Sequence, residues 1–229
     1  SYHIEDDFFA NFKILNENSR ENIFVIVENG NSAYNYRDVA GKMSNELRIT
    51  NLSLNYCFQT CWNTIDKPWN GFCAPEDFLN RYEAGVDHRG PCDAKLGTHG
   101  GDGWAWFLGP VYESETSDKI LKMEDKGNVE AIIVPQITSL TDATHNDGAR
   151  FLKYEVDKVG ANKYCENDFV LMRYADVLYM QYEAAYRAGD NAKCAELLAD
   201  PEFQKIRTRV GCTPYSSLDL DELLNERGR

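Results

Sequence analysis

The side chains best able to do chemistry gather within residues 56–112, which hold all four tryptophans of the chain. Tryptophan on a preformed loop offers a flat apolar face at low conformational cost, and nearby Asn, Asp and Lys side chains supply directed hydrogen bonds. This combination suits a sugar ring, which has an apolar C–H face and hydroxyl groups around its edge. The candidate ligand-binding residues are Trp62, Asn63, Asp66, Lys67, Trp69, Asn70, Trp104 and Trp106.

These tryptophans are not equal candidates. Trp62 is the leading one, because the polar residues 63–67 follow it directly. Trp69 is favoured as a scaffold residue that packs in a core or turn. Trp104 and Trp106 are two residues apart, so in a strand both would point to the same face. That face would be either an exposed pair of stacking platforms or part of a buried sheet.

Other chemistries find little support in the sequence. Asp87 and Arg89 are expected to form a structural ion pair, and His88, His99 and His145 are expected on the surface or in loops, since no second ligand stands near them. The motifs of serine hydrolases, zinc proteases and phosphate-binding loops are absent. With 37 acidic residues a carboxylate pair can always be named, so the sequence predicts no enzyme. It likewise indicates no cofactor, and calcium is left open.

The seven cysteines form no zinc signature, because the pair Cys57 and Cys61 has no second pair at a suitable spacing. One disulfide among Cys57, Cys61, Cys73 and Cys92 is an open alternative. Cys194 lies in a helical pattern and is expected in the core.

Charge narrows the range of partners. The net charge is −13, and the basic residues are scattered singly, so nothing in the chain would neutralise nucleic-acid phosphates or dock on an anionic membrane surface. No run reaches the ~18–20 apolar residues that cross a bilayer. Residues 1–12 lack the basic start and apolar middle of a signal peptide. A neutral ligand or a basic protein partner fits best.

The periodicity predicts three regions. Residues 1–55 begin with a helix that leads into a strand within 2–28, and a weakly helical piece follows at 39–47. Residues 56–165 are rich in loops, with one helix at 75–84 and short strands at 131–134 and 151–154. Residues 166–229 are helical, and the expected helices cover 168–188, 191–199, 201–209 and a segment from Asp219 onward.

Capping residues support these helices. Asn167 and Asp168 are expected to cap the first, Asp200 with Pro201 the third, and Asp219 with Glu222 the fourth. Within the first helix, ion pairs are expected between Arg173 and Asp176 and between Glu183 and Arg187. The first two helices, joined by a tight Gly-Asp turn, resemble one tetratricopeptide-type unit, which cannot bury its apolar faces alone.

Four motifs in order give the chain a family resemblance. Residues 4–26 (IEDDFFANFKILNENSRENIFVI), 69–89 (WNGFCAPEDFLNRYEAGVDHR), 151–154 (FLKY) and 173–189 (RYADVLYMQYEAAYRAG), followed by IRTRVG and LLNERGR, closely resemble the SusD/RagB family. This resemblance implies a mainly α fold, the SusD-like α-helical fold with tetratricopeptide-type helix pairs and a loop-rich, weakly β segment. The chain would correspond to the C-terminal portion of that fold, residues 1–229, without its N-terminal half.

The same resemblance implies a function. Family members are outer-membrane lipoproteins, exposed on the cell surface, that bind glycans without cleaving them. A SusC-like TonB-dependent transporter would be the partner, and the lipid anchor would lie outside this chain. The alternatives are a binder of peptide or protein nutrients on the same scaffold, a glycoside hydrolase, and a tetratricopeptide scaffold for a protein partner.

Overall fold

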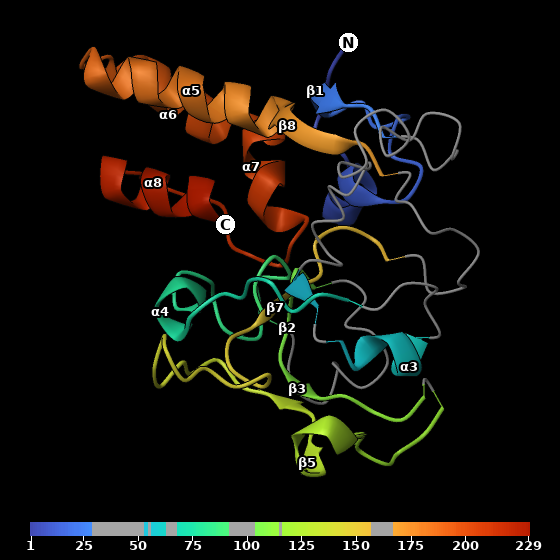
Figure 1. The fold of residues 1–229 in the computed structure, drawn as a ribbon. Helices are drawn as coiled ribbons and strands as arrows, with labels where there is room; N and C mark the ends of the chain where they lie inside the picture. Colours follow the sequence, from blue (N-terminus) through green and yellow to red (C-terminus); the bar gives the residue numbers. More distant parts are fainter. Residues whose placement is uncertain (29–52, 55, 63–67, 92–103, 115, 157–166) are drawn as a thin grey trace, which may run out of the picture.

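The computed structural model describes residues 1–28, 53–54, 56–62, 68–91, 104–114, 116–156 and 167–229. The helices α5 to α8, coloured orange to red in Figure 1, lie together at one end of the molecule. The loop-rich residues between α3 and β7, coloured cyan to yellow, lie at the other end. The expected helix at 39–47 falls outside the described residues.

The C-terminal helices follow the predicted pattern. They are α5 (Tyr174–Arg187), α6 (Asn191–Ala199), α7 (Pro201–Thr208) and α8 (Leu220–Gly228). Asp200 and Asp219 cap α7 and α8 as predicted, each accepting a hydrogen bond from a backbone N–H of the first turn. Gly189 has φ +71°, the left-handed conformation that lets the chain turn sharply from α5 into α6.

The start of α5 differs from the prediction. Residues Phe169–Arg173 form strand β8, which pairs antiparallel with β1 (Asn22–Ile26), and the helix begins at Tyr174. Asn167 and Asp168 therefore do not cap a helix. Instead, Asn167 Nδ2 donates to the carbonyl of Phe12 at 3.0 Å, and Asp168 Oδ1 accepts from the N–H of residue 28 at 3.0 Å.

The ion pairs expected in the first helix are half confirmed. Glu183 and Arg187 pair at 2.8 Å. Arg173, however, pairs with Glu21 at 3.0 Å rather than with Asp176. Asp176 accepts the backbone N–H of Arg173 at 2.9 Å and so caps the true start of α5.

The N-terminal helix is shorter than expected. It is a single 3₁₀ segment, η1 (Phe8–Phe12), capped by Asp7, which accepts the N–H of Phe9 at 2.9 Å. Phe8 and Phe12 are buried, whereas Leu15, which lies beyond the end of η1, is 63% exposed. The turn and strand that follow η1 are as predicted.

The loop-rich part contains short elements. Its helices are α3 (Phe58–Trp62), α4 (Glu76–Leu79) and the 3₁₀ segment η4 (Glu124–Lys126). Its antiparallel strand pairs are β2 (Trp106–Phe107) with β7 (Arg150–Phe151), β3 (Gly109–Pro110) with β6 (Ile132–Ile133), and β4 (Lys122–Met123) with β5 (Val129–Glu130). The expected helix at 75–84 is thus reduced to one turn. The strand expected at 131–134 is shortened to β6, and the strand expected at 151–154 overlaps β7 only at Phe151.

Two main hydrophobic clusters hold these parts. One packs the faces of α5 to α8 and includes Cys194, which is buried as predicted. The other surrounds Phe58 and Phe107 between α3 and the short strands. No disulfide joins Cys57, Cys61 and Cys73 to one another, and Cys92 falls outside the described residues. Within the part of the chain that the structure describes, no helix has the length and apolar character needed to cross a membrane.

Candidate functional site

The predicted ligand loop is described at its two ends. Trp62 closes α3, and Asn63, Asp66 and Lys67 lie outside the described residues. Trp69, expected to pack in the scaffold, is instead 59% exposed. The packing interpretation of Trp69 is therefore wrong, and its indole is accessible at the surface.

Asn70 fixes the far end of this loop. Its φ is +56°, a left-handed conformation that Asn tolerates better than most residues, and its N–H donates to the carbonyl of Leu54 at 3.1 Å. This bond ties the loop to the chain just before α3. Asn70 Oδ1 is a buried acceptor that has no donor among the described residues.

Trp104 and Trp106 belong to the core. Each is 9% exposed, and they join different hydrophobic clusters. Trp106 Nε1 donates to the hydroxyl of Tyr82 at 3.2 Å, and the Trp106 ring makes edge contacts with Phe78 and Phe151. Strand β2 begins only at Trp106, so the alternation that would put both rings on one face does not apply. The paired stacking platform does not form.

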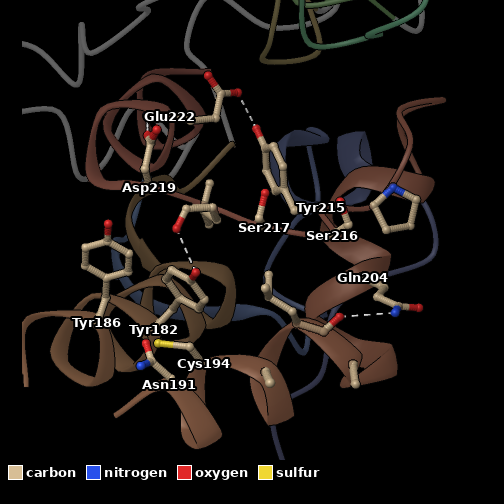
Figure 2. A pocket seen from close by; sticks show the side chains of 15 residues that line it. Tyr182, Tyr186, Asn191, Cys194, Gln204, Tyr215, Ser216, Ser217, Asp219 and Glu222 are labelled. Carbon is tan, nitrogen blue, oxygen red and sulfur yellow. Dashed lines mark hydrogen bonds between the residues drawn. The ribbon is translucent and has the colours of Figure 1, made fainter. Parts of the chain in front are cut away.

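A larger concavity, which was not predicted from the sequence, lies at the helical end. This cavity, of about 890 Å³, lies between α5, α6, α7, the start of α8 and the segment 214–218. Figure 2 shows the side chains that line it. Three tyrosines line it: Tyr182 and Tyr186 from α5, and Tyr215 from the segment before α8. Tyr182 and Tyr186 are four residues apart on a helix, and this spacing was the available sequence signal for the cavity. The same spacing is equally typical of two residues that pack in a hydrophobic core.

Several groups around this cavity are already engaged. The hydroxyl of Tyr182 donates to the carbonyl of Leu218 at 2.7 Å, and Gln204 Nε2 donates to the carbonyl of Leu198 at 3.1 Å. Burial, followed by the charge of Glu226 and the hydrogen bonds that the hydroxyl makes to Glu222 and Glu226, raises the pKa of Tyr215, so its hydroxyl stays protonated. The side chains of Tyr186, Asn191 and Ser217 make no hydrogen bond to any described residue, which leaves them able to meet ligand hydroxyls.

A buried charge network lies behind the cavity and joins the two ends of the molecule. The predicted ion pair of Asp87 and Arg89 is confirmed at 2.8 Å, with both side chains buried. The network contains a second carboxylate, which was not predicted. Glu226 of α8 accepts hydrogen bonds from Arg89 at 2.6 Å and from Arg207 at 2.7 Å. Glu226 also accepts hydrogen bonds from Tyr179 and Tyr215, both at 2.9 Å, and pairs with Arg229.

This network has a pH dependence with a definite sign. Burial alone would raise the pKa of Glu226, but Arg89, Arg207 and Arg229 outweigh it and hold that pKa well below its usual range. The folded state therefore binds this proton less readily than the unfolded state, so Glu226 stabilises the protein above pH about 4.5 and loses this effect as the pH falls.

We predict a steep loss of the free energy of unfolding below pH about 4.5. Urea unfolding at a series of pH values from neutral to acid would measure it. The Glu226→Gln variant should show a shallower pH dependence over this range. Equal slopes in both proteins would assign the acid sensitivity to other carboxylates.

Among the described residues, no group of three His, Cys, Asp or Glu side chains comes close enough to hold a metal ion. His88 is exposed, as predicted, and His145 is half-buried in a loop. His99 falls outside the described residues.

Comparisons with known proteins place these features in a family. A sequence model of the SusD family matches residues 29–229. Similar solved structures include surface glycan-binding protein A from Bacteroides thetaiotaomicron in complex with laminarihexaose (18% identity, TM-score 0.59, 99% of this chain and 43% of that chain). Also similar is surface glycan-binding protein A from Bacteroides uniformis (17% identity, TM-score 0.58, 100% of this chain and 38% of that chain). A third similar structure is a SusD superfamily protein from Parabacteroides distasonis (17% identity, TM-score 0.57, 99% of this chain and 40% of that chain).

At such identities these structures show the fold alone, and this chain spans about two fifths of the length of each. No curated protein shows significant similarity to the chain. The SusD-like fold expected from the motifs is confirmed, whereas the tetratricopeptide character of the α5 and α6 pair stays a prediction. Because the family match covers most of the sequence, the chain belongs to the SusD family.

Proposed function

We propose that this protein binds an oligosaccharide or polysaccharide at the cell surface without cleaving it. The observation that carries the proposal is membership of the SusD family, together with a fold shared with a surface glycan-binding protein whose structure contains laminarihexaose. We further propose that it is lipid-anchored at the outer membrane and delivers the glycan to a SusC-like TonB-dependent transporter. The negative net charge suits a neutral glycan.

We place the glycan contact on the loop from Trp62 to Asn70. The exposed indole of Trp69 supports this placement, since a sugar ring could stack on it without any rearrangement of the core. The side-chain oxygen Oδ1 of Asn70, which is buried and has no donor among the described residues, is a second polar group of this loop that lacks a partner. Residues 63–67 would supply further polar contacts, with Asn63, Asp66 and Lys67 as the expected ones.

Native affinity electrophoresis through gels that contain plant, algal and host polysaccharides tests the function. We expect one glycan to retard the protein and to release no reducing sugar. Release of reducing sugar that disappears with one acidic substitution would make the protein a glycoside hydrolase. Retardation by no glycan, together with binding to peptides, would replace the proposal with peptide-nutrient binding.

Alanine substitutions test the placement. We predict that Trp69→Ala and Trp62→Ala each weaken glycan binding by about 1–3 kcal/mol, the range typical of a lost aromatic anchor. Titration calorimetry with the retarding glycan, or with laminarihexaose, would measure the change.

Tyr186→Ala is the matched control, because Tyr186 is also an exposed aromatic residue but lines the cavity of Figure 2. Unchanged affinity in this variant is the expected result. If Tyr186→Ala loses affinity while both tryptophan variants keep it, the glycan binds in the tyrosine-lined cavity instead.

A further inference from the structure

A second cavity, of about 100 Å³, is distinguished by its charge. It lies among η1, α5, α7 and the end of α8, and its lining includes the aromatic ring of Phe8. Two acids line it, Asp176 and Glu226, against six bases: Arg89, Lys153, Arg173, Arg209, Arg227 and Arg229. In a protein of net charge −13, such a local excess of positive charge needs a physical explanation.

The arginines of this cavity have acidic partners. Glu226 pairs with Arg89 and Arg229, and Glu183 with Arg227. Arg173 and Arg209 share the single carboxylate of Glu21, which is fully buried. These pairs account for most of the positive charge.

Lys153 is different. Its ammonium lies 5.1 Å from the ring centre of Phe8 and 4.7 Å from that of Phe12, and it has no ion pair or hydrogen bond with any described residue. The guanidinium groups of Arg173 and Arg209 face the same Phe8 ring at 5.3 and 5.2 Å. Aromatic rings attract cations, but three cations around one ring also repel one another.

A second donor in this cavity is also unsatisfied. The Arg209 side chain is 2% exposed, and its Nε is buried without an acceptor among the described residues. Buried N–H donors are nearly always hydrogen-bonded, so an orphaned one on a residue that lines the same cavity as the Lys153 ammonium indicates a missing acceptor. An anion would satisfy both groups at once.

We propose that this cavity binds one small oxyanion, such as sulfate or phosphate, between Lys153 and Arg209. The volume is that of about three water molecules, which admits a single oxyanion but no sugar ring. Hydrogen bonds from cationic donors to an oxyanion are stronger than those between neutral groups. The ion could be free, or it could be the charged substituent of a larger molecule. The proposal is independent of the glycan site.

The ionisation of Lys153 agrees with this geometry. Burial first, and then the charges of Arg173 and Arg89, lower the pKa of Lys153 to about 7. A bound anion favours the protonated amine and would raise that pKa. Binding is therefore expected to be tighter at pH 6.5 than at pH 9, where the empty site would hold a neutral amine.

Thermal unfolding of the purified protein tests the site. At pH 6.5, sulfate should raise the Tm by about 2–4 °C over chloride at equal ionic strength. Sulfate also stabilises proteins in general. Lys153→Met, which keeps the apolar stem, should lose the site-specific part of the rise. Lys126→Met, which changes an exposed lysine of η4, should keep it. An equal rise in all three proteins would overturn the proposal.

Chemical labelling gives a test that needs no variant. Sulfate should slow the acetylation of Lys153 by acetic anhydride, followed by peptide mass spectrometry, and should leave Lys126 unaffected. Galactose 6-sulfate distinguishes the two sources: protection by inorganic sulfate alone identifies a free ion, and protection by both identifies a site open to an acidic sugar substituent. Protection by neither means that the cavity holds only water, which would overturn the proposal.

Discussion

Replacing Glu226 with alanine is expected to lower the free energy of unfolding by about 3–5 kcal/mol, the cost of removing one partner from a buried ion pair. The Glu226 side chain is fully buried and pairs with Arg89, Arg207 and Arg229. Without it, the buried guanidinium groups of Arg89 and Arg207 each keep one acidic partner among the described residues, Asp87 for Arg89 and Glu83 for Arg207. Urea unfolding at neutral pH would measure the loss.

Glu83→Ala is the matched control for Glu226→Ala. Glu83 pairs with the same Arg207, but its side chain is 45% exposed, so water can take its place. Because the carboxylate of this pair is largely exposed to water, we expect its removal to cost less, about 0–1 kcal/mol. A similar small loss in both variants would mean that the network does not hold α8 against the rest of the chain.

The ionic scaffold could be predicted only where its residues are close in the sequence. Asp87 and Arg89 are two residues apart, and Glu183 and Arg187 are one helical turn apart, so spacing alone predicted both pairs. Glu226 lies 137 residues from Arg89, and no local pattern reports such a contact. The helix caps at Asp200 and Asp219 were predictable for the same reason, because capping is a local interaction.

The predictions from the sequence were wrong where a local pattern fits more than one structure. The apolar residues 169–172 read as the first turn of a helix, although they pair with β1 as a strand. A short apolar run does not distinguish these two structures, and the tertiary partner decides. Burial was ambiguous in the same way. Trp69 was predicted to pack in a core or turn, yet its side chain is exposed. For Trp104 and Trp106 an exposed platform and a buried sheet face were equally favoured, and both residues lie in the core.

The two cavities could not be foreseen at all. The walls of the tyrosine-lined cavity come from α5, α6, α7, α8 and the segment before α8, so its residues have no common spacing in the sequence. The cationic cavity likewise joins Phe8, Lys153 and Arg209, which belong to three distant segments. Only the fold brings them together.

Glu21→Ala is expected to be as destabilising as Glu226→Ala, with a loss of about 3–5 kcal/mol in the free energy of unfolding. Glu21 is fully buried, accepts hydrogen bonds from Asn11 and from Arg209, and pairs with Arg173 at 3.0 Å. Its removal leaves both arginines without a carboxylate partner among the described residues, and it removes these ionic links between the N-terminal segment and the end of α7 and the start of α5. Urea unfolding at neutral pH measures this loss as well.

Asp6→Ala is the matched control for Glu21→Ala, because Asp6 lies in the same N-terminal segment and pairs with Lys205, yet is almost wholly exposed. Its removal should leave the unfolding midpoint unchanged, and an equal loss in both variants would contradict the role of burial. Removing Glu21 also leaves Arg173 and Arg209, which face Phe8 together with Lys153, without the carboxylate that they share. If an oxyanion neutralises this cluster, sulfate should stabilise Glu21→Ala more than it stabilises the wild type, because the anion then opposes a larger uncompensated charge.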